Sequence, residues 1–535
     1  MNQKKESIWN QINLKIFIPG VICLMIFICA GVFFPSRFYN ILDFIQSVFM
    51  SRFKWVYVLC AIMTSGVLIY LLFSKTGNIR FGGRNAKPSV STLSWVTISL
   101  TGSIAIGICF FGVAGPVNNF VNPPEFLGVT GGSPEAVVEA ISLCFLHYCI
   151  PPYFIVTFSG FAIGLLAYNG KRAFRASSTM YPLIGDKCDG VLGTIVDVVM
   201  VLSLVIVGTN MGLSVIQLNA GLGNLLNMDH PNFELMIMVV YVVATIYFAC
   251  SGLHAAMGKL SNVNAVFYCI VIAFVLLVGP TNRLILLGFE SVSNFLHEFI
   301  PTVGFGDAVL QTGWQEGNTM YYYSWNAMPG LLAAFFYAAM SYGRTLKEFV
   351  IVHCLVPSAF LVLWYVFIGG TAIFGVMDGS NLVEVIAEKG SGIATFAFLD
   401  TLPLGTLTKW MFIFMAIMTF VTWSDAIAVS FPQMFLKETA KDKANTKTPK
   451  ALIAGTAIFM GLLVFALLYA GGYDAMELSI TCWGLPSSIL LIFMAVAVIK
   501  FLAQRKKYDV TYQEELAEEQ PVEAEEAAFA KELPS

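Results

Sequence analysis

The chain has 535 residues, of which 57% are hydrophobic and only 12% are charged, and its mean hydropathy is +0.76. About a quarter of the residues of a soluble globular protein are charged, so this composition excludes that class and indicates a protein embedded in lipid. The net charge of -3, without a long basic face, gives no support for nucleic-acid binding. The eleven cysteines contain no CxxC pair, so we expect small buried apolar residues rather than disulfides or metal ligands.

The first residues are polar and run directly into a long apolar segment. Residues 1–13 lead into a run of spanning length without a small-residue cleavage site, so we expect a short cytoplasmic segment and a retained first helix. A bilayer core of about 30 Å needs about 20 apolar residues per helix. Such runs lie at residues 14–34, 54–73, 92–113, 140–169, 191–209, 235–254, 263–281, 319–341, 349–375, 407–430, 451–471 and 478–501. The sequence therefore predicts an all-α polytopic membrane protein with twelve transmembrane helices within residues 14–501.

Two other segments have a different character. Residues 284–300 are amphipathic and flanked by Arg283 and Glu298, which predicts a helix lying at the membrane interface. The last segment, 502–535, is acidic, and its part 514–532 is rich in Glu, Ala and Pro with few large apolar residues. Such a composition buries too little surface to fold by itself, so we expect a disordered or helical cytoplasmic tail.

The basic residues of the short loops predict the orientation, because cytoplasmic loops retain an excess of Lys and Arg. The loops on one side carry Lys75, Arg80, Arg84, Lys87, Lys171, Arg172, Arg175, Lys187, Lys259, Arg344, Lys347, Lys437, Lys441, Lys443, Lys447 and Lys450. On the other side, segments 114–139 and 210–234 contain no Lys or Arg at all. Lys500, Arg505, Lys506 and Lys507 follow the last span. We therefore expect a multi-pass protein of the cell membrane with both termini in the cytoplasm.

Two of the predicted spans contain residues that weaken a helix. The third span has glycines at Gly102, Gly107 and Gly112, and the eighth has Pro329 followed by Gly330. Many secondary transporters consist of two inverted repeats whose first helices are interrupted near the midplane, where backbone groups face substrate and ion. The alternative is that these residues only pack or kink the helices, as glycine and proline often do in membranes.

The positions of these two spans divide the chain into two halves. Spans three to seven (92–281) and eight to twelve (319–501) would form two inverted five-helix repeats in a LeuT-like arrangement, with the first two spans outside them. In such a protein the repeats rock around a central pocket and open it to one side at a time. The pattern of breaks therefore favours a transporter that works by alternating access.

An aromatic cluster precedes the predicted break in the eighth span. It begins at Tyr321 and ends at Trp325, which helical spacing places over Tyr321 and Tyr322, with Asn326 beside them. Aromatic faces attract a cation with about 0.5 to 2 kcal/mol each when desolvated. An aromatic belt at the membrane interface explains Tyr321 equally well. Trp325 lies one turn deeper, which favours a binding site for a small polar or cationic solute.

At these motifs the sequence resembles the betaine/carnitine/choline transporter family. The family's eighth span has an opening tryptophan, an aromatic run, paired tryptophans and a closing Arg-Gly-Arg-Thr; this chain has 318–326 (NTMYYYSWN) and Tyr342-Gly343-Arg344-Thr345. Further agreements are 175–179 (RASST), 182–185 (PLIG), 193–197 (GTIVD), 260–264 (LSNVN), and His147 with Pro152-Tyr153 for a His-Trp…Pro-Trp motif. The resemblance covers roughly residues 15 to 500 and implies a transporter rather than an enzyme.

The predicted pocket departs from the family pattern. Asn326 stands at the second tryptophan of the pair, and Asn118 at an aromatic position of the third span. The resemblance implies a binding site built from Trp325, Tyr323, Tyr322, Asn326, Asn118, Phe110 and Phe111. The resemblance implies a betaine-like zwitterion as the substrate. Because asparagine forms hydrogen bonds, a substrate with N–H donors or a less methylated amine is the alternative.

The resemblance also implies a coupling ion and an assembly. Sodium-driven relatives use third-span carbonyls and a Thr-Ser pair in the tenth span; here Thr422 is followed by Trp423 and then Ser424. We expect ion-coupled uptake with Thr422 and Ser424 as sodium ligands and no other cofactor. A sodium-independent exchanger of the same family is the alternative. Relatives are homotrimers, so by analogy a homotrimer is expected for this chain. Membrane lipid is its other expected partner.

Other classes of function have weaker support. A channel should show a repeated filter or a ring of like charges, and neither is present. His147 and Cys149 are close in sequence but lack the spacing of a metal or nucleophile motif, so an enzyme is not expected. Asp197 and Asp425 are candidates for ion or gate positions, with structural pairing as the alternative for Asp197. A solute sensor that binds without flux stays open.

Overall fold

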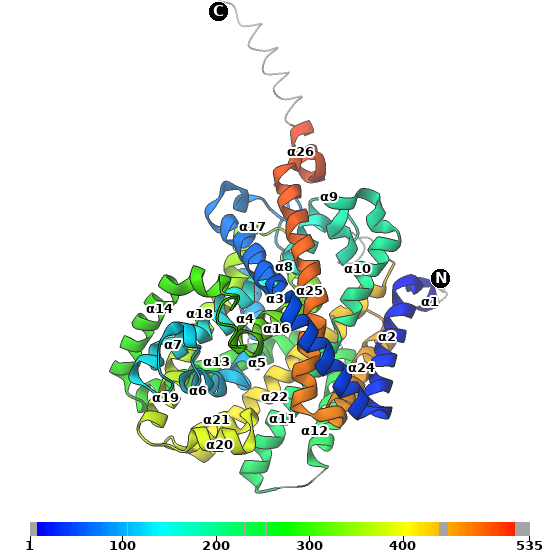
Figure 1. Cartoon of the computed structure of the whole chain (residues 1–535). Coiled ribbons are helices and arrows are strands. Elements are labelled where there is room, and N and C mark those ends of the chain that lie inside the picture. Colours follow the sequence, from blue (N-terminus) through cyan, green and yellow to red (C-terminus); the bar gives the residue numbers. More distant parts are fainter. Residues whose placement is uncertain are drawn as a thin grey trace, which may run out of the picture.

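The computed structural model describes residues 8–103, 105–228, 230, 232–251, 254–437 and 448–518. Within these residues the chain is almost entirely helical and contains no strand longer than an isolated bridge, one between Ile12 and Leu436 and one between Arg80 and Thr345. Figure 1 shows the helices gathered into one bundle. The predicted all-α class is therefore confirmed for the described part of the chain.

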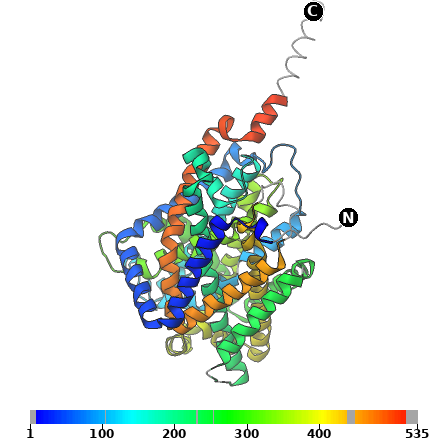
Figure 2. The same cartoon turned by 90° about the vertical axis from the view of Figure 1, so that its right-hand side faces the viewer.

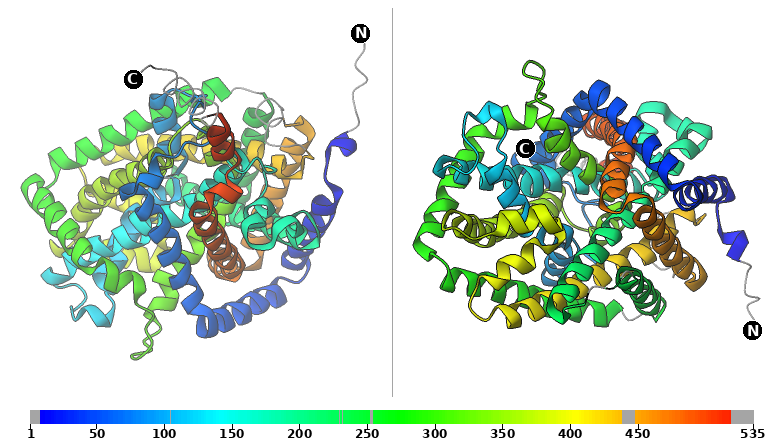
Figure 3. Two further views of the ribbon diagram at one scale, coloured as in Figure 1. Left: turned by 90° about the horizontal axis from the view of Figure 1, so that it is seen from above. Right: turned by 60° about the horizontal axis from the view of Figure 1, so that its bottom comes forward.

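The longest helices follow the predicted spans along the chain (Figure 1). They are α2 (Leu14–Phe33), α3 (Pro35–Phe73), α8 (Ile150–Tyr168), α10 (Val191–Leu202), α11 (Val205–Leu226), α12 (Phe233–Ser251), α13 (His254–Val278), α14 (Thr281–Gly304), α16 (Thr319–Met340), α22 (Gly405–Ser430), α24 (Lys450–Gly471) and α25 (Tyr473–Ala503). Shorter elements complete the bundle: α4 (Thr92–Ser103), α5 (Ala105–Cys109), α6 (Phe111–Val121), α7 (Pro134–Cys144), α17 (Leu346–Val350), α18 (Val356–Trp364), α19 (Gly370–Met377), α20 (Leu382–Lys389), α21 (Ala394–Asp400) and α26 (Arg505–Tyr508). In Figure 3 the bundle is seen from above and obliquely with its bottom turned forward.

Ten helical segments of the described chain are long and apolar enough to cross a membrane. Each of them overlaps one of the predicted spans. The two remaining predicted spans lie on α4 to α6 and on α16. The first falls outside the ten because it is divided into helices that are each too short to cross a membrane, and α16 because tyrosine, serine and asparagine lower its hydropathy. The polytopic class is therefore shown, whereas the count of twelve stays a prediction.

The two predicted breaks have different outcomes. The third span is interrupted at Phe110, which separates α5 from α6. The eighth span is not interrupted, because α16 is one α-helix from Thr319 to Met340 with Pro329 inside it. The prediction of a rupture at Pro329 and Gly330 is therefore wrong for this conformation.

Helix packing explains why α16 keeps a glycine there. A Cβ added to Gly330 would lie 2.6 Å from the backbone oxygen of Val156 in α8, so this glycine allows two helices to approach closely. The hydroxyl of Ser159 in α8 donates a hydrogen bond to the Gly330 carbonyl. Neighbouring helices supply such bonds around membrane prolines, which allows the helix to continue through Pro329. Gly330 is thus a packing residue, as the alternative interpretation held.

The second helix of each predicted repeat contains a matching local feature. Residues Phe145–Cys149 and Ile351–Leu355 are both π-helical, each has a histidine as its third residue, and each histidine is followed four positions later by a proline. Proline clashes with the carbonyl four residues before it, and a π-turn is one way to relieve that clash. This internal correspondence is what two five-helix repeats predict.

The two histidines also make equivalent contacts. His147 Nε2 lies 3.1 Å from Thr319 Oγ1, at the first residue of α16. His353 Nδ1 lies 2.7 Å from Ser99 Oγ in α4, and its Nε2 accepts a hydrogen bond from the indole of Trp95. Each histidine therefore joins the second helix of one predicted repeat to the first helix of the other, and both rings are fully buried.

The basic loops meet at one end of the bundle, where α9 (Tyr181–Ile184), α17 and α26 lie in Figure 1. Phe81 N donates to Arg344 O at 2.9 Å, and Asn13 N donates to Phe435 O at 2.7 Å. Lys15, Arg175 and Lys437 line one shared surface pocket. Figure 2, a side view, shows α1 (Ile8–Gln11) and the last described helix on this same half of the molecule. Basic segments that are far apart in the sequence thus lie at the same end of the bundle.

The beginning of the acidic tail packs against this end. Residues 510–518 are helical after α26. Val510 N donates to Asn169 O at 2.8 Å, and Arg84 N donates to a carboxylate oxygen of Glu515 at 2.7 Å. This part of the predicted tail is therefore docked on the loops, while residues 519–535, and with them most of 514–532, lie outside the described residues.

The predicted interfacial segment 284–300 lies within α14, which Figure 1 places at the rim of the bundle. Leu284, Leu287 and Phe295 are buried against the bundle, while Phe289 and Leu296 are exposed on the outer side. In an aqueous protein such exposed apolar residues would be costly, but lipid contacts stabilise them. The helix thus covers the bundle with one face and presents an apolar face outward.

Candidate functional site

A cavity of about 90 Å³ lies beside the middle of α16. Its wall includes Trp325, Asn326 and Pro329 from α16, and Tyr148 and Tyr153 from the π-helical segment and α8. Asn210 of α11 and Trp423 of α22 also line it. No charged side chain belongs to this wall, as far as the described residues go. The cavity is therefore aromatic and neutral, which suits a solute whose cationic group is attracted to π-faces.

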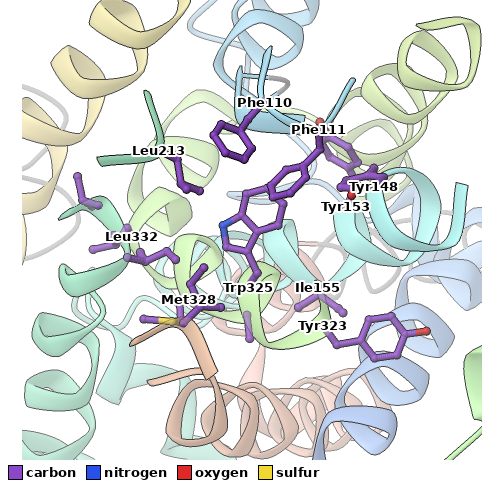
Figure 4. Close-up of a cluster of buried hydrophobic side chains, with 14 of the residues drawn as sticks. Phe110, Phe111, Tyr148, Tyr153, Ile155, Leu213, Tyr323, Trp325, Met328 and Leu332 are labelled. Atoms are coloured by element: carbon purple, nitrogen blue, oxygen red, sulfur yellow. The ribbon is translucent and has the colours of Figure 1, made fainter. Parts of the chain in front are cut away.

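Trp325 is the central residue of this wall. Its side chain is 7% exposed, and its indole Nε1 donates a hydrogen bond of 2.9 Å to Asn210 Oδ1. An indole N–H that is buried needs such a partner, so Asn210 fixes the plane of the ring. The ring of Phe111 packs edge-on against Trp325 with centroids 5.3 Å apart (Figure 4). The indole is thus held in one orientation with one face turned to the cavity.

Aromatic residues close the cavity on the side where α16 begins. Tyr148 OH donates to Tyr322 OH at 2.6 Å, and the ring of Phe111 stacks on Tyr148 with centroids 5.7 Å apart. Phe110 lies next to Phe111 and stacks on Tyr473. Phe110, Phe111 and Tyr148 are each less than 5% exposed. These side chains form an aromatic layer that separates the cavity from one end of the protein.

Towards the other end the small cavity continues into a larger one of about 350 Å³. The two share Ala333, Tyr337, Trp423 and Ile427. The larger cavity extends along α16 to Met340 and reaches Gln433. Because Met340 ends α16 next to the basic loops, the path from Trp325 leads to the end of the bundle that carries both described chain ends.

The structure places the seven predicted substrate residues in three groups. Trp325 and Asn326 line the small cavity. Tyr322, Phe110 and Phe111 do not line it, but belong to the aromatic layer that covers it.

Two predicted residues lie elsewhere. The fully buried Tyr323 points away from Trp325 towards α3 (Figure 4), because successive residues of a helix are rotated by about 100°. Asn118 is exposed, three residues before the end of α6, and lines neither cavity.

The two predicted sodium ligands are not brought together. Thr422 lines the larger cavity and its hydroxyl donates to Met418 O at 2.7 Å within α22. Ser424 is fully buried, and its hydroxyl lies 2.6 Å from Tyr241 OH in α12. Residues two apart on an α-helix point in nearly opposite directions, so this conformation separates the two hydroxyls.

Most wall residues were not among the predicted site residues, and three of them carry polar groups that shape the cavity: Tyr148, Tyr153 and Asn210. Tyr148 and Tyr153 belong to the His-Tyr…Pro-Tyr motif at residues 147–153, so the motif itself was the signal that could have placed them in the wall. Asn210 gave no such signal, because a single amide in an apolar helix does not reveal which neighbour it bonds. Only the packing of α11 against α16 shows its partner.

The other ionisable candidates have structural partners. The carboxylate of Asp197 accepts hydrogen bonds from Ser177 N at 2.8 Å and Ser177 Oγ at 2.9 Å, as the structural interpretation held. Arg344 donates to Thr92 Oγ1 at 2.9 Å and lies over the ring of Trp95, so it ties the start of α4 to the end of α16. Asp425 lines the larger cavity beside Thr422.

Comparison with known proteins adds the following. The family model for the BCCT, betaine/carnitine/choline family transporter, matches residues 15–507. The chain is 26% identical to a glycine betaine transporter of Acinetobacter baylyi, over 94% of this chain and 75% of that protein. It is 27% identical to the osmo-independent choline transporter BetT1 of the same species, over 94% and 95% of the two chains. It is also 27% identical to the betaine/ectoine transporter LcoP of Corynebacterium glutamicum, over 92% and 79%.

Among solved structures, a similar chain is that of MhsT in complex with L-phenylalanine. The TM-score is 0.40 at 14% identity, with 78% of this chain and 100% of that chain covered.

Proposed function

Since this chain belongs to the betaine/carnitine/choline transporter family, and is a multi-pass membrane transporter rather than an enzyme, we propose that it carries a small betaine-like zwitterion across the cell membrane by alternating access. Its relatives are named as transporters of betaine, choline and ectoine. The observation that carries the proposal is the neutral aromatic cavity around Trp325, beside the middle of α16. A methylated ammonium group fits such a wall without a carboxylate to neutralise it.

The arrangement of the two cavities supports the alternating-access part of the proposal. The aromatic layer of Phe110, Phe111, Tyr148 and Tyr322 covers the small cavity on one side, while the larger cavity continues on the other. A transporter needs one closed and one open side in each state. We propose that relative motion of the two repeats parts the aromatic layer and closes the larger cavity around Tyr337 and Trp423.

Coupling to sodium is a further part of the proposal. Thr422 offers a hydroxyl beside the larger cavity, and the third span is interrupted at Phe110, as first-repeat helices are in many ion-coupled transporters. Ser424 would join Thr422 only in a conformation that separates its hydroxyl from Tyr241. A sodium-independent exchanger of the same family is the alternative.

The test of this function is uptake by proteoliposomes that contain the purified protein. We expect saturable accumulation of radiolabelled glycine betaine driven by an inward sodium gradient. This accumulation should be lost when potassium replaces sodium in a buffer that contains no choline. Counterflow that persists without sodium would favour the exchanger. Binding without flux in either condition would favour a sensor and would contradict transport.

We also propose that the end with the basic loops faces the cytoplasm. Arg80, Arg175 and Arg344 lie in the loops of this end, and α26 adds further basic residues. Since cytoplasmic loops retain Lys and Arg, a fluorescent protein fused after Ser535 is expected to fluoresce in a bacterial host, and alkaline phosphatase fused there to stay inactive. The same two reporters fused at residue 230, between α11 and α12, are the matched control and should give the opposite result. Active phosphatase at Ser535 would reverse the orientation.

A further inference from the structure

The side chain of Asn210 has a fixed orientation at the cavity wall. It is 4% exposed, and its Oδ1 accepts the indole hydrogen bond of Trp325 at 2.9 Å. An indole N–H only donates, so the carboxamide oxygen of Asn210 must be the end that faces Trp325. The amino end of the carboxamide then points away from the indole. No described residue accepts a hydrogen bond from this Nδ2, and Asn210 lines the small cavity.

Asn326 presents the opposite end of its carboxamide. Its Nδ2 donates a hydrogen bond of 2.7 Å to the backbone carbonyl of Tyr322. A carbonyl only accepts, so the amino group of Asn326 is used within α16 and the oxygen is the end left for the cavity. The wall therefore offers a donor at Asn210 and an acceptor at Asn326, on two different helices.

The charges around the two cavities restrict how an anionic group is bound. Neither cavity is lined by Lys or Arg in the part of the chain that is described, and Asp425 is the acidic residue of the larger one. A carboxylate that enters the small cavity therefore finds no cationic side chain to pair with. Buried charges need hydrogen bonds when they have no counter-ion, so neutral donors must stabilise it. Among the wall residues, Nδ1 of the buried His147 and Nδ2 of Asn210 have no partner among the described residues, and only Asn210 also bonds the indole of Trp325.

We propose that Asn210 is the residue that selects a carboxylate-bearing substrate, by donating its Nδ2 hydrogen bond to the carboxylate while its Oδ1 holds Trp325 against the ammonium group. This inference rests on the proposed transport function and deepens it. The ammonium end of the zwitterion would face Trp325 and its carboxylate end Asn210, and the hydrogen bond between these two residues links the two binding groups. It assigns glycine betaine, rather than its alcohol analogue choline, as the preferred chemistry of the site.

The variant Asn210→Asp tests this assignment. Aspartate has nearly the same shape and still accepts from the Trp325 indole, but it replaces the donor by an anionic oxygen that repels a carboxylate. We expect the ratio of half-saturation concentrations, glycine betaine over choline, to rise at least about tenfold relative to the wild type, because charge-assisted bonds are worth at least one decade. The measurement is competition by both compounds in proteoliposomes.

Three further variants keep the test decisive. Asn210→Ser retains a neutral hydroxyl donor and is expected to keep betaine preferred, whereas Asn210→Leu has none and should lose that preference. If Asn210→Asp fails to reach the membrane, this pair carries the comparison. Trp325→Phe removes the indole donor and part of the ring but keeps an aromatic face; it separates positioning from direct contact, since it should weaken both compounds alike.

The outcomes distinguish the inference from the proposed function. Wild-type protein that transports neither compound overturns the function itself. Wild-type transport with an unchanged ratio in both Asn210→Asp and Asn210→Leu leaves the function intact and overturns the role of Asn210. A ratio that changes in Trp325→Phe as much as in Asn210→Asp would likewise overturn it, because Asn210 would then act only by positioning the indole.

Discussion

Replacement of Trp325 by alanine is expected to raise the half-saturation concentration of uptake at least about tenfold, while the protein still folds and reaches the membrane. A tenfold change corresponds to about 1.4 kcal/mol, and one desolvated aromatic face contributes up to about 2 kcal/mol to the binding of a cation. The variant also leaves Asn210 without its indole partner and removes the ring on which Phe111 packs. The measurement is the concentration dependence of initial uptake in proteoliposomes.

Trp410→Ala is the matched control for this variant. Trp410 also lies on a long membrane helix, α22, but its side chain is 45% exposed and lines neither cavity. The same substitution there should leave the half-saturation concentration within about twofold of the wild type, since exposed side chains away from a site contribute little. Unchanged uptake in Trp325→Ala would remove Trp325 from the site.

Gly330→Ala is expected to destabilise the folded transporter by about 1 to 3 kcal/mol, the usual cost of overpacking a core. The added Cβ would lie 2.6 Å from Val156 O and 3.0 Å from Val156 Cα, and these are backbone atoms that cannot rotate away. Helices α8 and α16 would have to separate, which also stretches the bond between Ser159 and the Gly330 carbonyl. A lower melting temperature of the detergent-solubilised protein measures this effect.

Gly455→Ala supplies the comparison for that experiment. Gly455 lies within α24, and a Cβ added there meets no atom within 4 Å. Alanine favours a helix more than glycine does, so this variant should melt at the wild-type temperature or slightly above it. If both variants melt alike, the contact between α8 and α16 is looser than described, and a break at Gly330 becomes the better interpretation of the Pro-Gly pair.

The contrast between Phe110 and Pro329 shows where prediction from sequence reached its limit. Both predicted breaks rested on glycine or proline inside an apolar run, yet only the third span is interrupted. Glycine serves two purposes in membrane helices, flexibility and close approach, and the residue itself does not reveal which one applies. The answer depends on whether another backbone lies opposite, and for Gly330 that backbone is α8, more than 160 residues earlier in the chain.

The site shows the same division. Trp325 and Asn326 were predicted from one continuous motif, because each lies one helical turn after a tyrosine of the cluster. Tyr323 belongs to the same motif but points the other way. Thr422 and Ser424 were paired because they are close in sequence, although the turn of α22 directs their side chains to different sides. Asn210 could not be predicted, since its role follows from the contact with a helix more than a hundred residues away.

By itself the sequence determined the membrane class, the positions of the spanning segments, the family and the helix that carries the aromatic cluster. These are local properties, because lipid selects apolar runs of fixed length and motifs lie within single helices. Only the tertiary structure decided which break is real, which face of α16 meets the cavity, and that Asn210 holds Trp325. Those properties depend on pairs of atoms from distant segments, and their hydrogen bonds and close approaches exist only when the helices pack.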